Sequence, residues 1–559
     1  MLSGRLKTNI FKRIAAAVIA VMLLAVFGCS ADVTEKPDNT SMPNSTKGQE
    51  TPSPAPEVPK SGGTLKLSVG PYDIIDPLRT SNEDVRLFMC TFVCENLIDI
   101  DSNMLPVPRI LTSWVCDETY KVWEFKVAQD VVFHSGYKAE AADVRDLINN
   151  IIGFGGNYSD NVKNVAGCFA KDKETVQVIL AKPDALFVNK LSIPLVGWKT
   201  VTSDRPIVMD GTGVFKTTEF DGDHILLEKN TLYRDKSKLT YYNTVDITVY
   251  ESENAKTLSD SDICVLQGAA VGSNLLREGS TVYYYGGTGY DFIALNCAST
   301  YLLGSAGDSM TGENKNYITL ANPLSDKRLR QVINLITSRE NAVRAAASDH
   351  GKIALVPLYS GTAYRKQLKA DYDYSPERAI SLLREIGYVK TDDGWFMDDE
   401  ELIVRGICPR YNFRMLAVMR EAATALKSIG VRVEIAELTD AEYLERLNNR
   451  EYMIAAVETE LGVWQDCRDI LGTLGSLNYS FYSDARVDGY LEQIALHSDP
   501  AVVSAAYSKI EEIVLEDCPI VGLFIADNAI IVSKRVKGVR EEVLRPWSPL
   551  ADALNWWID

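Results

Sequence analysis

Residues 113–144 read SWVCDETYKVWEFKVAQDVVFHSGYKAEAADV, and this stretch decides how the rest of the chain is interpreted. Val122–Ala128 alternates in side-chain character, as a strand of a half-buried sheet does. Val131–Phe133 is a second short apolar run, which predicts the second strand of a hairpin. His134–Gly136 predicts a turn, and Lys138–Val144 the start of a helix whose first turn carries acids, as the helix dipole favours. The predicted unit is strand, strand, turn and helix, without a catalytic motif.

Nine residues of this stretch lie at or near positions that one protein family prefers: Trp114, Tyr120, Phe125, Val132, His134, Gly136, Ala142, Asp143 and Val144. Arg330-Gln331, Gly211-Thr-Gly213 and the helix signals around Ser375-Pro376-Glu377 are similar to further motifs of the same family. On these residues the chain resembles the bacterial extracellular solute-binding proteins of family 5, the oligopeptide, dipeptide and nickel receptors of ABC importers. The resemblance covers about residues 62–559.

The resemblance implies an α/β fold of the type II periplasmic-binding-protein kind, with two lobes of mixed sheets flanked by helices and a small extra domain inserted in the first lobe. A chain of 559 residues is indeed too long for a single core. The implied layout is a signal peptide (1–28), a tether (29–61), lobe I (62–84, 206–293 and 526–559), the inserted domain (85–205) and lobe II (294–525).

The second half of the chain carries its own periodic signals. We expect a helix over 413–429, a strand over 431–437, a helix from Asp440 and a strand over 452–457, an alternation that predicts a sheet covered on both faces. Asp499-Pro500 predicts the N-terminus of a long helix that ends before Pro519.

The N-terminus predicts export and lipid anchoring. Basic residues up to Arg13 precede an apolar run, Ile14–Gly28, that is shorter than the ~20 residues that span a bilayer. Val26-Phe-Gly-Cys29 resembles a bacterial lipoprotein cleavage box, so Cys29 is the predicted lipidation site and the protein is expected on the extracytoplasmic face of the cell membrane. Ser30–Ser61 is rich in Pro, Ser, Thr and charge, which predicts an extended tether. The alternative is an exported protein with an incidental cysteine.

Composition narrows the possible partners. The net charge of −18 disfavours nucleic acid and anionic lipid. The ten cysteines are scattered, and nine remain once Cys29 is used, so we expect mainly core thiols, with one or two disulfides left open. We expect a monomer whose partners are a peptide or other small solute, an ABC permease and, through its anchor, the membrane.

Catalytic and metal-binding patterns are missing from the sequence. The four histidines are far apart and form no HExxH, and no GxSxG occurs. Ser135-Gly-Tyr-Lys138 fits SxxK without its companion motifs, and Gly307–Gly312 lacks the phosphate-loop lysine. The prediction is a protein that is not an enzyme and needs no cofactor and no metal.

One loop could carry ligand chemistry: Gly462-Val-Trp464-Gln-Asp466-Cys-Arg-Asp469, directly after a predicted strand. In open α/β sheets ligands collect beyond the carboxyl ends of strands. The loop is similar to a family motif whose first acid holds the α-amino group of a peptide, which implies this role for Asp466, with Trp464 as an apolar wall. Tyr72 and Asp73, after the first strand, are candidates on the opposite lobe. The alternative is a solvated turn with two surface acids.

The function that these features predict is a lipid-anchored receptor that closes two lobes over a peptide and delivers it to a permease. The sequence also allows a receptor for a nickel complex or an oligosaccharide, because such receptors share the fold and the residues of the pocket determine which solute binds. A sensory lipoprotein without transport also remains open. A surface peptidase or transpeptidase is disfavoured by the missing nucleophile and metal ligands.

Overall fold

The computed structural model describes residues 58–197, 209–222, 224–238, 240–250, 261–268, 271, 276–304, 317–365, 373–464 and 466–559. The predicted signal peptide, Cys29, nearly all of the tether and the glycine loop 307–312 lie outside these residues. None of the helices in the described part of the chain has the length and apolar character that a membrane span requires.

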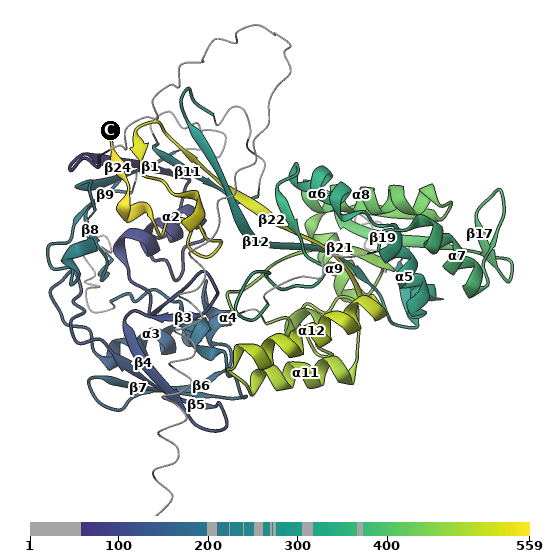
Figure 1. The fold of residues 1–559 in the computed structure, drawn as a ribbon, viewed down its shortest axis with the longest axis horizontal. Coiled ribbons are helices and arrows are strands. Elements are labelled where there is room, and N and C mark those ends of the chain that lie inside the picture. Colours follow the sequence, from purple (N-terminus) through teal and green to yellow (C-terminus); the bar gives the residue numbers. More distant parts are fainter. Residues whose placement is uncertain are drawn as a thin grey trace, which may run out of the picture. The chain divides into compact units, whose positions relative to one another are not determined.

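The main sheet of the described residues has eleven strands in the order β20-β19-β21-β12-β22-β11-β1-β10-β9-β8, with β15 paired to β22 (Figure 1). Its strands are β1 (Thr64–Val69), β8 (Phe215–Phe220), β9 (His224–Lys229), β10 (Thr244–Val249), β11 (Ile263–Leu266), β12 (Thr281–Leu295), β15 (Gly351–Ile353), β19 (Ile403–Pro409), β20 (Arg432–Leu438), β21 (Ile454–Glu460) and β22 (Ile520–Val532).

Two long antiparallel strands, β12 and β22, belong to both halves of this sheet (Figure 1). β22 pairs with β11 through Ala529–Val532, whereas β12 pairs with β21 through Gly289–Leu295. Between these regions the register shifts at Gly286–Tyr290. A Cβ on Gly287 would overlap the carbonyl of Ala526, so only glycine fits this bulge. The buried side chains correspondingly form two large cores, one on either side of the shift.

The first half carries a separate four-stranded sheet in the order β4-β5-β7-β6, made of β4 (Leu111–Cys116), β5 (Val122–Val127), β6 (Val165–Ala170) and β7 (Thr175–Leu180). Helix α3 (Ala141–Phe154) packs on β6 and β7. The inward residues Trp123 and Phe125 of β5 are buried and stack, as the alternation predicts. These strands lie within the segment predicted to be an inserted domain.

The hairpin predicted after β5 is wrong. β5 pairs with the preceding strand β4 and with β7, while Val131–Phe133 forms no strand and contributes one isolated bridge, Val132 to Lys138. Val131 and Phe133 are nevertheless buried. The apolar pattern therefore reported burial correctly, but burial does not specify which strand supplies the hydrogen-bonding partner.

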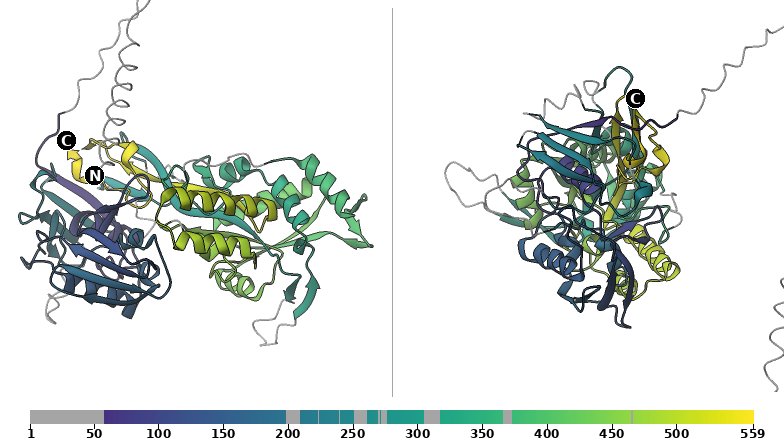
Figure 2. Two further views of the ribbon diagram at one scale, coloured as in Figure 1. Left: turned by 60° about the horizontal axis from the view of Figure 1, so that its bottom comes forward. Right: turned by 90° about the vertical axis from the view of Figure 1, so that its left-hand side faces the viewer.

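The second half contains the predicted α-β-α-β series. Strands β20 and β21 both pair parallel to β19, and α8 (Phe413–Ser428) and α9 (Asp440–Asn449) connect them. The predicted long helix is α12 (Pro500–Asp517), N-capped by Asp499, and it packs against α11 (Ala485–Ala495) (Figure 2). Further helices of this half are α5 (Lys327–Ile336), α6 (Arg339–Ala347), α7 (Pro376–Ile386) and α10 (Arg468–Leu471).

The remaining elements are short. They are α2 (Glu83–Phe88), a π-helical turn (Met89–Val93), β2 (Ile98–Ile100), β3 (Pro106–Pro108), α4 (Ser159–Val162), β13 (Thr300–Gly304), β14 (Tyr317–Ala321), β16 (Val389–Lys390), β17 (Trp395–Met397), β18 (Glu400–Glu401), β23 (Val536–Lys537) and β24 (Trp557–Ile558). Short 3₁₀ turns cover Phe187–Leu191, Lys236–Lys238, Pro323–Ser325, Glu541–Val543 and Ala553–Asn555.

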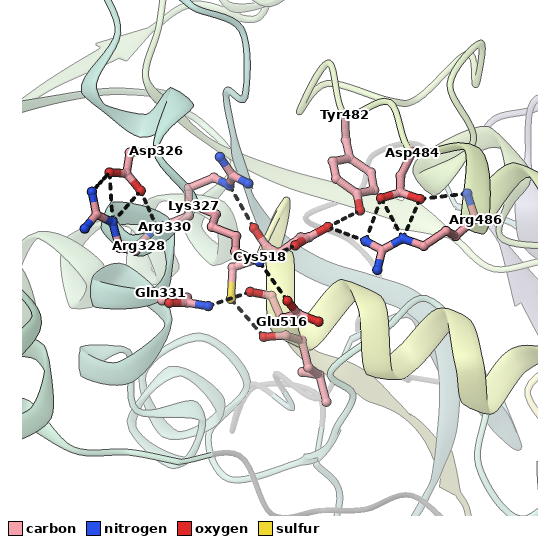
Figure 3. Close-up of polar contacts among 12 residues, drawn as sticks. Asp326, Lys327, Arg328, Arg330, Gln331, Tyr482, Asp484, Arg486, Glu516 and Cys518 are labelled. Carbon is pink, nitrogen blue, oxygen red and sulfur yellow. Dashed lines mark hydrogen bonds and ion pairs between the residues drawn. The ribbon is translucent and has the colours of Figure 1, made fainter. Parts of the chain in front are cut away.

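Arg330-Gln331, one of the motifs behind the resemblance, closes the C-terminus of α12 (Figure 3). The buried Arg330 guanidinium donates to the carbonyl oxygens of Asp517 at 2.9 Å and Leu324 at 2.8 Å. The Gln331 amide donates to the carbonyl of Glu516 at 2.7 Å. The last carbonyls of a helix have no partner within it, so these donors supply what α12 lacks.

Candidate functional site

The loop predicted to bind ligand follows β21 at the carboxyl edge of three parallel strands. β19 pairs parallel with β20 and with β21, so Pro409, Leu438 and Glu460 end their strands at the same edge of the sheet. Gly462, Trp464 and Asp466 lie in the loop that leaves this edge, and Gln465 lies outside the described residues. The structure thus places the loop where open α/β sheets bind ligands.

Trp464 is held against its own loop. A Cβ on Gly462 would overlap the Trp464 indole, so glycine at 462 makes room for the ring. The indole is partly buried, and the Lys190 Nζ lies 5.8 Å from the ring centroid, within the range of a cation–π contact. Trp464 therefore presents an apolar wall that is only partly covered.

Asp466 is exposed at the end of the loop. One carboxylate oxygen accepts the backbone N–H of Arg468 at 3.0 Å, which orients the side chain at the start of α10. The other carboxylate oxygen makes no hydrogen bond that involves the described residues. The side chain is thus oriented by the backbone and still accessible to a cationic group.

Asp469, three residues further on, has a protein partner. Its carboxylate pairs with the Lys163 Nζ at 2.8 Å, next to α4. Burial raises the pKa of Asp469, but the hydrogen bond and charge of Lys163 outweigh it and the net pKa is lowered. Asp466 and Asp469 therefore differ: one is open to a ligand, and the other is tied to a lysine that lies 306 positions away in the sequence.

Two lysines from the first half of the chain, Lys163 and Lys190, contact this loop, and sequence analysis did not select them. Lys190 pairs with Asp184 at 2.7 Å, where both side chains are largely buried. In the same region the Ala185 N–H donates to the carbonyl of Ala495 at 2.9 Å. No motif marks Lys163 or Lys190, so their place beside the loop depends on tertiary structure.

Tyr72 and Asp73 lie in the turn between β1 and α2. The Tyr72 hydroxyl donates to the Gly222 carbonyl at 3.1 Å, and its ring lies 6.3 Å from that of Phe220. The Asp73 carboxylate accepts backbone N–H groups of Ser81 at 3.2 Å and Ile74 at 3.0 Å, and these bonds lower its pKa. These contacts hold the turn together within the first half of the chain, so a ligand role for the two residues stays a prediction.

A charged cluster that the sequence did not indicate lies at the same sheet edge. Asp291 of β12 is almost fully buried, and its Oδ2 is 3.1 Å from the Arg414 Nε. Arg414 also pairs with Glu458 of β21, which accepts from the Asn412 side-chain amide at 3.0 Å. Burial raises the pKa of Asp291 to about 7, against the opposing charge of Arg414. Two carboxylates share one guanidinium here, because β12, β21 and α8 converge.

Among the described residues, no group of three or more His, Cys, Asp or Glu side chains is placed to hold a metal ion. None of the nine cysteines in the described residues forms a disulfide. Burial raises the pKa of the Cys408 and Cys297 thiols to about 11. These thiols are therefore protonated at neutral pH, as expected of core residues.

The fold is the mixed α/β fold of the type II periplasmic-binding proteins. Solved structures with this fold include the murein tripeptide-binding protein MppA in an unliganded open form (17% identity, TM-score 0.72, 90% of this chain and 98% of that one). They also include AppA from Bacillus subtilis in complex with a nonapeptide (19%, 0.61, 90% and 100%) and NikZ from Campylobacter jejuni with Ni(L-His) (18%, 0.62, 88% and 99%).

Sequence comparison gives the family. The oligopeptide-binding protein AppA of Bacillus subtilis is 22% identical over 96% of this chain and 97% of its own length, and the probable D,D-dipeptide-binding periplasmic protein DdpA of Escherichia coli is 21% identical over 77% and 81%. The model of the bacterial extracellular solute-binding proteins, family 5 Middle, matches residues 106–478. The chain belongs to this family, as the sequence motifs predict.

Proposed function

We propose that this protein is a lipid-anchored extracytoplasmic receptor of an ABC importer, which binds peptides between two closing lobes and delivers them to the permease. Family membership supports a solute-binding role. The observation that carries the choice of peptide is Asp466, an oriented and exposed carboxylate beside Trp464 at the carboxyl edge of the parallel strands. An α-ammonium group supplies the positive charge and the three donors that such a carboxylate can bind.

The relatives favour the same ligand class without fixing the ligand. Their names describe binding of oligopeptides, D,D-dipeptides and glutathione, while two neighbouring structures are named for a nickel complex and for a nickel ABC transporter. Hinged closure over a solute is a general mode of two-lobed binding proteins. The register shift at Gly286–Tyr290 in β12 is a suitable hinge, because it interrupts the strand pairing between the two cores.

The proposal is tested by identifying what the natively purified protein carries. Mass spectrometry after denaturation should detect peptides, and apo protein should bind free peptides in calorimetry while N-acetylated versions bind much more weakly. Binding should stabilise the fold by roughly 2.7 kcal/mol at a hundredfold excess over Kd, without turnover. Equal affinity for free and acetylated peptides would show that the protein does not bind the peptide through its α-ammonium group. A released metal complex, or cleavage that a point mutation abolishes, would replace the peptide receptor with another function.

A further inference from the structure

An apolar hollow lies beside the candidate site, at the ends of β19 and β20. It has a volume of about 570 Å³, and its walls include Pro409, Tyr411, Phe413, Tyr443 and Leu444. Phe413 is 81% exposed, Tyr411 63% and Leu444 54%. Neighbouring aromatic and aliphatic side chains left this open on a soluble protein usually mark a binding surface.

The hollow shares its sheet edge with the loop that holds Asp466. Pro409 pairs with Leu438 of β20, and Ile407 pairs parallel with Ala455, so β21 continues past the level of Pro409 at the same sheet edge before its loop begins. Neighbouring strands are about 4.8 Å apart, so β20 and β21 are separated by roughly 10 Å across β19. An extended peptide covers this distance with about three residues.

Side chains at the boundary connect the two regions. Asn412 lines the hollow, caps α8 through the Met415 N–H at 3.0 Å and donates to Glu458 at 3.0 Å. The Tyr443 hydroxyl is bound to the Ala456 carbonyl at 2.5 Å, so its polar atom is engaged and its ring carbons form the wall. Glu458 in turn pairs with Arg414, which also pairs with Asp291, so Asn412 joins the hollow to the charged cluster at this sheet edge.

We propose that this hollow is a specificity subsite that takes an aromatic or long aliphatic side chain of the peptide whose amino group Asp466 holds. The proposal rests on the proposed function and adds a preference to it. The apolar residue belongs beyond the first position of the peptide, because Asp466, which holds the amino group, is not among the residues that line the hollow. Removing such a side chain from water favours binding by about 10- to 100-fold.

Four tetrapeptides with a single phenylalanine moved through positions one to four, and tetra-alanine as reference, test the proposal by calorimetry. Wild type should prefer phenylalanine at one of positions two to four by about 10- to 100-fold over tetra-alanine. Phe413→Ser and Leu444→Ser should lose that preference and keep the affinity for tetra-alanine. Val389→Ser, which changes an exposed residue of β16, should behave as wild type.

The outcomes separate this inference from the proposed function. Binding of tetra-alanine without any positional preference in wild type, or a preference that survives both substitutions, overturns the subsite alone. If the two variants keep the preference for phenylalanine but support less peptide uptake in cells, the hollow binds a protein partner instead, and the subsite proposal is wrong. Failure to bind any of the five peptides overturns the peptide receptor and the subsite together.

Discussion

At the residue scale, the charge of Asp466 decides the proposed recognition of the ligand. Asp466→Asn keeps the shape of the side chain and removes its charge. Losing one partner of a desolvated charge pair costs about 2–5 kcal/mol, so peptide affinity should fall on the order of 30- to several thousandfold. Titration calorimetry measures this, with Asp393→Asn, in an exposed turn, as the control for loss of one negative charge. If Asp466→Asn binds peptide as tightly as wild type, a residue other than Asp466 binds the ammonium group.

Asp291 should make stability depend on pH. Its pKa is raised to about 7 in the folded protein, above the 3.8 of an ordinary Asp, so the folded state holds a proton that the unfolded state has lost between these values. Stability contributed by this group is therefore present below about pH 4 and falls as pH rises towards 7, in total by on the order of 4 kcal/mol.

Urea unfolding of wild type and Asp291→Asn at several pH values isolates this contribution, because the other titrating groups are common to both. The Asn variant should become more stable relative to wild type as pH rises from 4 to 7. Arg414 and Glu458, which face Asp291, are present in both proteins. A stability difference that stays constant over this range would contradict the raised pKa.

At the scale of elements, the junction of α5 and α12 depends on one buried arginine. Arg330 is 5% exposed and donates to three carbonyl oxygens, those of Asp517, Leu324 and Ser325. Arg330→Ala leaves these acceptors without the donor and should lower the free energy of unfolding by about 2–4 kcal/mol. The midpoint of urea unfolding measures the change.

Arg328, two residues earlier in α5, is a matched control (Figure 3). It is exposed and pairs with the N-cap Asp326 through its side chain. An exposed pair contributes little, so Arg328→Ala should cost less than about 1 kcal/mol. Equal losses from the two substitutions would show that the α12 carbonyls do not depend on Arg330.

At the scale of the whole molecule, Cys29 is predicted to decide where the protein resides. The apolar segment before it is shorter than a bilayer span, and the residues after it suit a tether, so we predict that a covalent lipid on Cys29 anchors the protein. Wild type should incorporate a fatty-acid label and fractionate with membranes, while Cys29→Ala should do neither. If the variant stays membrane-bound and wild type takes up no label, the lipoprotein prediction is wrong.

Local sequence determined much of the fold. Asp499-Pro500 and Ser375-Pro376 place two helix N-termini correctly, because capping depends on residues that are neighbours in the chain. The alternation of 122–128 predicts β5 and its buried face for the same reason. The family motifs of 113–144 and 330–331 predict the solute-binding class, and Gly462, Trp464 and Asp466 come together because five positions of one loop contain them.

Only the tertiary structure decided the long-range pairings. The sequence predicted that β5 pairs with Val131–Phe133, whereas in the structure it pairs with β4. An apolar pattern indicates which face of a strand is buried, but it does not indicate which strand lies beside it. Lys163 meets Asp469, and Asp291 meets Arg414 and Glu458, across separations of 306, 123 and 167 residues that no local pattern encodes. Such contacts form only when strands and helices that are distant in the sequence pack at one sheet edge. The pKa values of these carboxylates then depend on how much water the packing excludes and on which charges it places beside them.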